Sequence, residues 1–79
     1  MRVFVLTETD STDYKWCYNE TFHKREDAVK RMRQLYHENI VERNELVVAS
    51  EYDEDAGKAS GEMVDGLFIS WNIKECDVM

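Results

Sequence analysis

Apolar and polar positions follow a helical pattern between residues 25 and 39. The apolar positions there are Ala28, Val29, Met32, Leu35 and Tyr36. Their i, i+3, i+4, i+7 and i+8 spacing places them in one stripe and predicts an amphipathic helix of about four turns. Glu26 and Asp27 lie in its first turn, where acidic side chains interact favourably with the helix dipole. We expect the helix to end at Asn39 and Ile40 to fold back onto the core.

Two strand patterns precede this helix. Residues 3–8 are rich in β-branched and aromatic residues, which favour a strand. Residues 9–13 are turn formers. Residues 14–22 place aromatic side chains at even spacing, so they predict a second strand with one aromatic face. Together these segments predict an N-terminal hairpin.

Two further strand patterns follow the helix. Residues 46–49 form an apolar run that extends toward Tyr52, and residues 67–74 alternate apolar and polar positions as a half-buried strand does. The intervening residues 53–61 are polar and include two glycines, so we interpret them as a loop. The chain contains no proline and no internal repeat that would mark a domain boundary.

The predicted fold is therefore one α+β domain spanning residues 1–79, with the element order ββαββ. It is an antiparallel sheet with one amphipathic helix packed on one face. The predicted core residues are Met32, Leu35, Ile69 and Trp71. Because a single helix covers only one face of such a sheet, the other face is expected to carry Phe68 together with Phe4 or Leu6. An apolar patch of that size predicts weak self-association as a homodimer, strengthened by salt.

Composition places the chain among ordinary soluble domains. It is 43% hydrophobic and 34% charged, with a formal net charge of −7. It has no apolar run approaching the roughly 20 residues that span a bilayer, and its opening run is too short for a signal peptide. We therefore expect a cytoplasmic protein with no membrane partner. Cys17 and Cys76 do not make a disulfide framework and are expected to be reduced.

Sequence motifs exclude most catalytic and cofactor chemistry. The chain has no glycine-rich phosphate loop, no zinc-type cluster and no nucleophile elbow. His23 and His37 are fourteen residues apart, about 20 Å along a helix, so they cannot share a metal. Residues 51–62 partly follow the spacing of a calcium loop, but Ala56 stands where that loop needs glycine. The sequence thus predicts no enzyme, no metal and no cofactor.

Charge is separated along the chain. Residues 24–33 carry a net charge of +3, whereas residues 34–79 carry −8. The leading hypothesis is a non-enzymatic protein that binds another protein with a basic surface, because clustered carboxylates can imitate phosphates. The alternative interpretation of an acidic surface is that it only keeps the protein soluble. The candidate contact residues are Glu51, Asp53, Glu54, Asp55, Glu62 and Asp65.

The basic segment supports an alternative hypothesis, a nucleic-acid-binding or accessory module. Its candidate residues are Lys24, Arg25 and Arg31 on the helix face of residues 24–33. A net charge of −7 disfavours nucleic acid, because phosphate neutralisation supplies most of the affinity in such complexes. These cations are instead expected to pair with acidic side chains of the same molecule.

Two short stretches resemble known proteins. Val3-Phe4-Val5-Leu6-Thr7-Glu8, followed by Phe22-x-x-x-Glu26-Asp27-Ala28 at a helix start, resembles short uncharacterised bacterial and phage proteins. Those proteins join an N-terminal hairpin to one helix and further strands. Small acidic α/β proteins of this size include phage-encoded inhibitors of host defence, anti-CRISPR proteins among them. The resemblance implies an inhibitor encoded by a phage or mobile element, and it carries over no functional residue.

Overall fold

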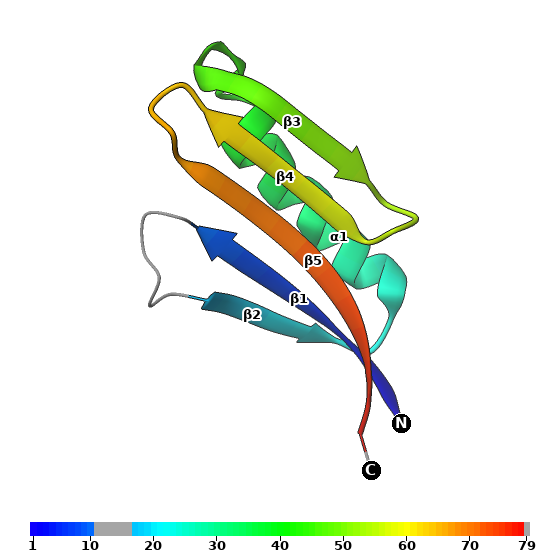
Figure 1. Ribbon diagram of the computed structural model, residues 1–79. Coiled ribbons are helices and arrows are strands. Elements are labelled where there is room, and N and C mark those ends of the chain that lie inside the picture. The colour runs from blue at the N-terminus through cyan, green and yellow to red at the C-terminus, as the bar shows by residue number, and fades with distance from the viewer. Residues whose placement is uncertain (11–16, 79) are drawn as a thin grey trace.

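The computed structural model describes residues 1–10 and 17–78 (Figure 1). In chain order, the main elements are β1 (Arg2–Asp10), β2 (Cys17–Phe22), α1 (Arg25–Tyr36), β3 (Val47–Asp53), β4 (Lys58–Met63) and β5 (Phe68–Asp77). A π-helical turn, His37–Val41, and a 3₁₀ turn, Asn44–Leu46, connect α1 to β3. Thr9 and Asp10, which were predicted to start a turn, belong to β1; the rest of that predicted turn and the first residues of the predicted second strand lie outside the described residues.

The described strands form one five-stranded antiparallel sheet in the order β2-β1-β5-β4-β3. The helix α1 lies across one face of this sheet (Figure 1). The first and last strands pair along the middle of the sheet, from Arg2 opposite Asp77 to Asp10 opposite Ile69. The structure confirms a small α+β domain with an antiparallel sheet and one helix. The ββαββ order is wrong, because a fifth strand lies between β3 and β5.

That strand is β4, which forms within the predicted loop. A turn of residues 54–57 joins it to β3, and Gly57 N donates to Glu54 O at 3.1 Å. Gly57 has a φ of +68°, a conformation that glycine adopts without steric penalty. Along β4, Ala59, Gly61 and Met63 alternate with Lys58, Ser60 and Glu62. The alternation has the period of a strand, but the small inward side chains make it a weak hydrophobic signal.

The small residue at position 61 makes room for Ile40. A Cβ placed on Gly61 would lie 2.1 Å from Ile40 Cδ1. Ile40 is buried, as expected from the sequence, and it belongs to the core cluster. Close approach of a side chain to the strand backbone therefore explains why glycine occupies the middle of β4.

The helix begins where the sequence predicted but ends earlier. The α-helical part stops at Tyr36, not Asn39, and continues as the π-helical turn. Asn39 Nδ2 donates to Leu35 O at 2.8 Å, so a side chain takes a carbonyl that the helix ladder would otherwise use. Glu42 N donates to His37 O at 2.9 Å, five residues back. The change in winding directs Ile40 onto the sheet.

The core lies between α1 and the sheet. Leu6, Met32, Ile40, Ala59 and Trp71 form its fully buried cluster. Met32 and Trp71 are confirmed as core residues, and Leu35 and Ile69 are partly buried against the cluster. Trp71 Nε1 donates to Glu8 Oε1 at 2.7 Å, so the indole is both packed and hydrogen-bonded.

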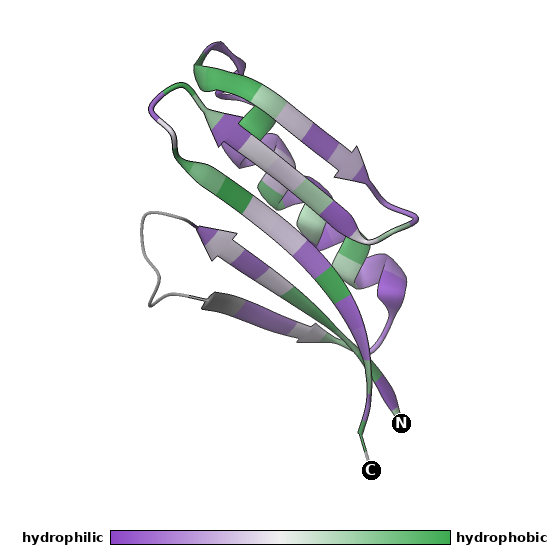
Figure 2. Cartoon of the chain, in the orientation of Figure 1, coloured by the Kyte–Doolittle hydropathy of each residue, from purple (hydrophilic) through white to green (hydrophobic). Residues whose placement is uncertain are grey.

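The face of the sheet opposite α1, called here the open face, is mostly polar. Leu6 pairs with Ile73 in register and faces α1, so Phe4, two residues away on β1, faces α1 as well. Phe68, one residue before Ile69, faces the other way. The predicted apolar patch of Phe68 with Phe4 or Leu6 is therefore wrong. The open face of β5 continues with Ser70, Asn72, Lys74 and Cys76. In Figure 2, β5 is hydrophobic near its start and has hydrophobic and hydrophilic residues interspersed further along.

Two remaining sequence predictions concern cysteines and membranes. Cys76 is a free thiol opposite Val3, and Cys17 stands opposite Thr9. Val3 and Thr9 are six residues apart on β1, so the backbone positions of the two cysteines are about 20 Å apart along the sheet. Within residues 1–10 and 17–78, no helix has the length and hydropathy needed to cross a membrane.

Candidate functional site

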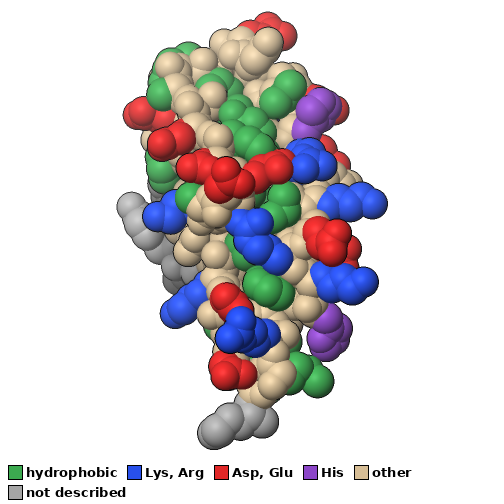
Figure 3. All heavy atoms as spheres, turned by 90° about the vertical axis from the view of Figure 1, so that its right-hand side faces the viewer, with side chains coloured by type: hydrophobic (Ala, Val, Ile, Leu, Met, Phe, Trp, Pro, Cys, Tyr) green, Lys and Arg blue, Asp and Glu red, His purple; other side chains and the backbone are tan. Residues whose placement is uncertain are grey.

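The arginines of α1 are engaged by β2 and by the β3–β4 turn. Arg31 Nε lies 3.2 Å from Glu20 Oε2 on β2. Arg33 Nη2 lies 2.7 Å from Glu54 Oε1 in the β3–β4 turn. Arg25 Nη2 donates to the backbone oxygens of Glu54 and Asp55. Figure 3 shows basic and acidic side chains side by side on this surface. Lys24 is exposed at the start of α1, and its side chain has no partner among the described residues.

Glu54 is the acidic residue most tightly held. Its carboxylate accepts hydrogen bonds from the Tyr52 hydroxyl and from Arg33 Nε, the latter at 2.8 Å. These two donors, Tyr52 first, hold the pKa of Glu54 below its ordinary value of 4.5. Burial, followed by the bond to Glu54, raises the pKa of the Tyr52 hydroxyl above 10.0. Glu54 therefore fastens the β3–β4 turn to α1 and is not free to meet a partner.

This arrangement predicts a pH dependence of stability. Because the pKa of Glu54 is lower in the folded protein, its stabilising contribution is present above pH 4.5 and is lost as the pH falls through the folded value. The Glu54→Gln variant should be less stable than the parent at pH 7, and the two should converge in acid. Thermal unfolding between pH 7 and pH 2.5 would measure this. Glu51→Gln, which removes an exposed carboxylate, should keep the parental profile, and a constant gap between Glu54→Gln and the parent would contradict the prediction.

The other candidate acidic residues fall into separate places. Glu51, Asp53 and Glu62 lie on the open face of β3 and β4, because their register partners there are Ser60, Lys58 and Ala49. Asp55 is exposed in the β3–β4 turn. Asp65 lies in the turn at the opposite end of β4, where its carboxylate accepts from Leu67 N at 3.1 Å. The structure therefore brings only Glu51, Asp53 and Glu62 onto one surface.

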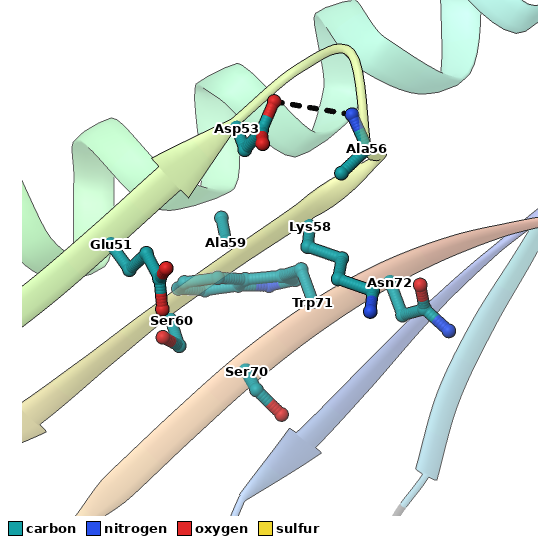
Figure 4. Close-up of a pocket in the computed structure, with 9 residues that line it drawn as sticks. All are labelled: Glu51, Asp53, Ala56, Lys58, Ala59, Ser60, Ser70, Trp71 and Asn72. Carbon is teal, nitrogen blue, oxygen red and sulfur yellow. Dashed lines mark hydrogen bonds between the residues drawn. The ribbon is translucent and has the colours of Figure 1, made fainter.

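Two shallow hollows adjoin this acidic surface on the open face. One hollow, of about 380 Å³, crosses β3, β4 and β5. Its polar lining includes Glu51, Lys58, Ser60, Ser70 and Asn72 (Figure 4). Small side chains at Ser60 and Ser70 leave this space between the longer ones. Glu51 and Glu62 line the second hollow, of about 400 Å³, together with Ser60 and Phe68.

The chain matches no protein-family model, and no curated protein or solved structure is significantly similar to it. The described residues hold no group of three or more His, Cys, Asp or Glu placed to bind one metal ion.

Sequence reasoning did not find the contribution of β4 to the open face. Lys58 and Ser60 lie in residues 53–61, which were predicted to be a loop. Ser70 and Asn72 lie in a predicted strand, but the β4 residues that pair with them were not recognised as a strand. The period-two alternation of residues 58–63 was the available signal. Lys58 also places a cation opposite Asp53, so the open face of the hairpin is acidic but not uniformly so.

Proposed function

We propose that the protein is a non-enzymatic binding protein that acts through protein–protein interaction. Its contact surface is the open face of the β3–β4 hairpin, where Glu51, Asp53 and Glu62 stand. The partner presents a basic surface to these carboxylates. The function suits an inhibitor encoded by a phage or mobile element, because carboxylates fixed on a sheet can occupy a site that another protein uses for phosphate.

One observation carries this proposal: the arginines of α1 are paired within the molecule, whereas two carboxylates of the hairpin are not. The arginines of α1 are engaged by Glu20, Glu54 and backbone oxygens. By contrast, the carboxylates of Glu51 and Glu62 are exposed, and neither makes a hydrogen bond or ion pair within the described part of the chain. The hairpin thus presents negative charge that is available to a partner.

The nucleic-acid alternative receives less support. Of its three candidate residues, Arg25 is held by the β3–β4 turn and Arg31 by β2, which leaves the side chain of Lys24 as the free cation of the three. Releasing the two arginines for phosphate would break contacts that join α1 to β2 and to the β3–β4 turn. A gel shift with DNA and RNA, repeated with Lys24→Ala/Arg31→Ala, tests this alternative, and binding abolished by that variant would favour it.

The proposal can be tested with a lysine decapeptide as a basic probe. We expect its addition to shift the backbone NMR signals of β3 and β4. Glu51→Gln/Glu62→Gln should weaken binding about fivefold, as expected for losing two exposed charge interactions. Glu26→Gln/Glu38→Gln removes the same charge from the helix side and serves as the matched control. Equal weakening by the two double variants would show attraction to net charge alone and would contradict a hairpin site.

A further inference from the structure

The strand β3 leaves one side of its backbone available. It is at the edge of the sheet and, within the described residues, pairs only with β4. Edge strands in natural proteins are commonly protected by lysine, proline or a covering element. β3 has the sequence VVASEYD, which contains neither lysine nor proline, and it pairs regularly with β4 from Ala49 to Asp53, after a register shift between Val47 and Ala49. The outer N–H and C=O groups of residues 49–53 can therefore accept a further strand.

An apolar hollow lies beside this edge, on the side of the sheet that carries α1. Its volume is about 400 Å³, and its lining comes from the last residue of α1, the two turns that follow it and the first half of β3, with Asn44 and Ser50 as its polar members. The apolar lining residues are Tyr36, Ile40, Val41, Val47, Val48 and Ala49. Val41 is 46% exposed and Val48 is 59% exposed, so water now covers much of this surface. Hydrophobic side chains gather at this edge in Figure 3.

The second half of β3 is acidic. Glu51 and Asp53 lie on its open-face side, and Asp55 follows in the turn. In Figure 3 a band of acidic side chains adjoins the hydrophobic group. A second copy of this chain is a poor occupant, because it would bring the same carboxylates and a further net charge of −7 to the seam. Charge complementarity instead favours a strand that carries lysine or arginine.

We infer that β3 binds an extended segment of a partner protein as a sixth strand of the sheet. The segment has apolar side chains at alternate positions, which enter the hollow beside Val41 and Val48. Lysine or arginine at the intervening positions lies on the open face, near Glu51 and Asp53. The inference rests on the proposed function, since it specifies which part of a basic partner meets the hairpin.

Strand addition has a distinctive chemical requirement. Backbone hydrogen bonds to the sheet edge provide affinity, and the side-chain pockets provide selectivity. In an added strand, alternate residues direct their N–H groups toward the sheet, while the others direct theirs to solvent. Binding through charge alone would not distinguish these two sets of N–H groups.

A blocked heptapeptide of alternating lysine and valine is a suitable probe. Two forms would be compared, one with N-methyl groups on the valines and one with N-methyl groups on the lysines. We expect one form to bind at least about tenfold more weakly than the unmethylated peptide, and the other to bind as well as it does. Equal affinity of the two methylated forms, whether retained or lost, would overturn strand addition.

Two valines of matched exposure locate the site. Val41 and Val78 are both 46% exposed, but only Val41 lines the hollow. Val41→Ser should weaken peptide binding about fivefold and Val78→Ser should not, with melting curves confirming that both fold. Equal affinities of the two variants would overturn the placement beside β3. If Glu51→Gln/Glu62→Gln weakens decapeptide binding while N-methylation has no effect, the proposed function stands and strand addition is excluded.

Discussion

Trp71→Ala should destabilise the protein by about 3–5 kcal/mol, the range found when a buried aromatic residue is truncated. Trp71 is 1% exposed, and its ring meets Tyr36 edge-on at a centroid distance of 6.1 Å. The substitution also leaves the partly buried Glu8 carboxylate without its indole donor. A domain of this length has a total stability of roughly 4–12 kcal/mol, so much of the variant would be unfolded.

Urea unfolding followed by circular dichroism would measure this loss. Trp71→Phe is the matched control, because it keeps an aromatic ring in the core and removes the N–H donor. It should therefore lose less stability than Trp71→Ala. A melting temperature for Trp71→Ala within two degrees of the parent would show that the indole is not central to the core.

Gly61→Ala is expected to cost about 1–3 kcal/mol through overpacking. Replacing glycine by alanine in a strand restricts the unfolded chain and would by itself stabilise by about 0.4–1 kcal/mol. The steric term should outweigh this gain, because the new Cβ would lie 2.1 Å from Cδ1 of the buried Ile40. Ile40 must then adopt another rotamer inside a packed core.

A double-mutant cycle can identify this contact. Ile40→Val removes Cδ1 and should alone cost about 0.5–1.5 kcal/mol. Combined with Gly61→Ala, it should cost less than the two single losses added together, because the clashing atom is gone. Ser60→Ala, on the open face of the same strand, is the control and should change stability little. Strict additivity of the cycle would contradict the predicted clash.

The fold was predictable wherever hydrophobic periodicity was strong. The apolar stripe of residues 28–36 placed the helix, and the alternation around Trp71 placed a core strand. The sequence did not reveal β4. Its residues that face α1 are Ala59, Gly61 and Met63, and because two of these are small, the two faces of the strand differ little in hydrophobicity. The apolar runs of β1 also left open which parity faces the helix. Only pairing with β5 decides this, by placing Leu6 opposite Ile73.

The charges of the candidate site were readable from sequence, but their partners were not. Arg33 and Glu54 are twenty-one residues apart and meet because the β3–β4 turn lies against α1. That contact removes Glu54 from the exposed acidic surface, whereas Glu51, three residues earlier, stays on it. Local sequence cannot separate these two glutamates, because the difference depends on which side of the sheet each one faces.

The central pairing of β1 with β5 has a consequence for the order of folding. The β1–β2 and β3–β4 hairpins have local contacts and can each form early, but neither is adjacent to the other in the sheet. They are joined by β5, which is the last strand in the chain. Until β5 inserts, β1 and β4 each lack a neighbour, and Trp71 is absent from the core. Because this step closes contacts across nearly the whole sequence, we expect it to be the slow step of assembly.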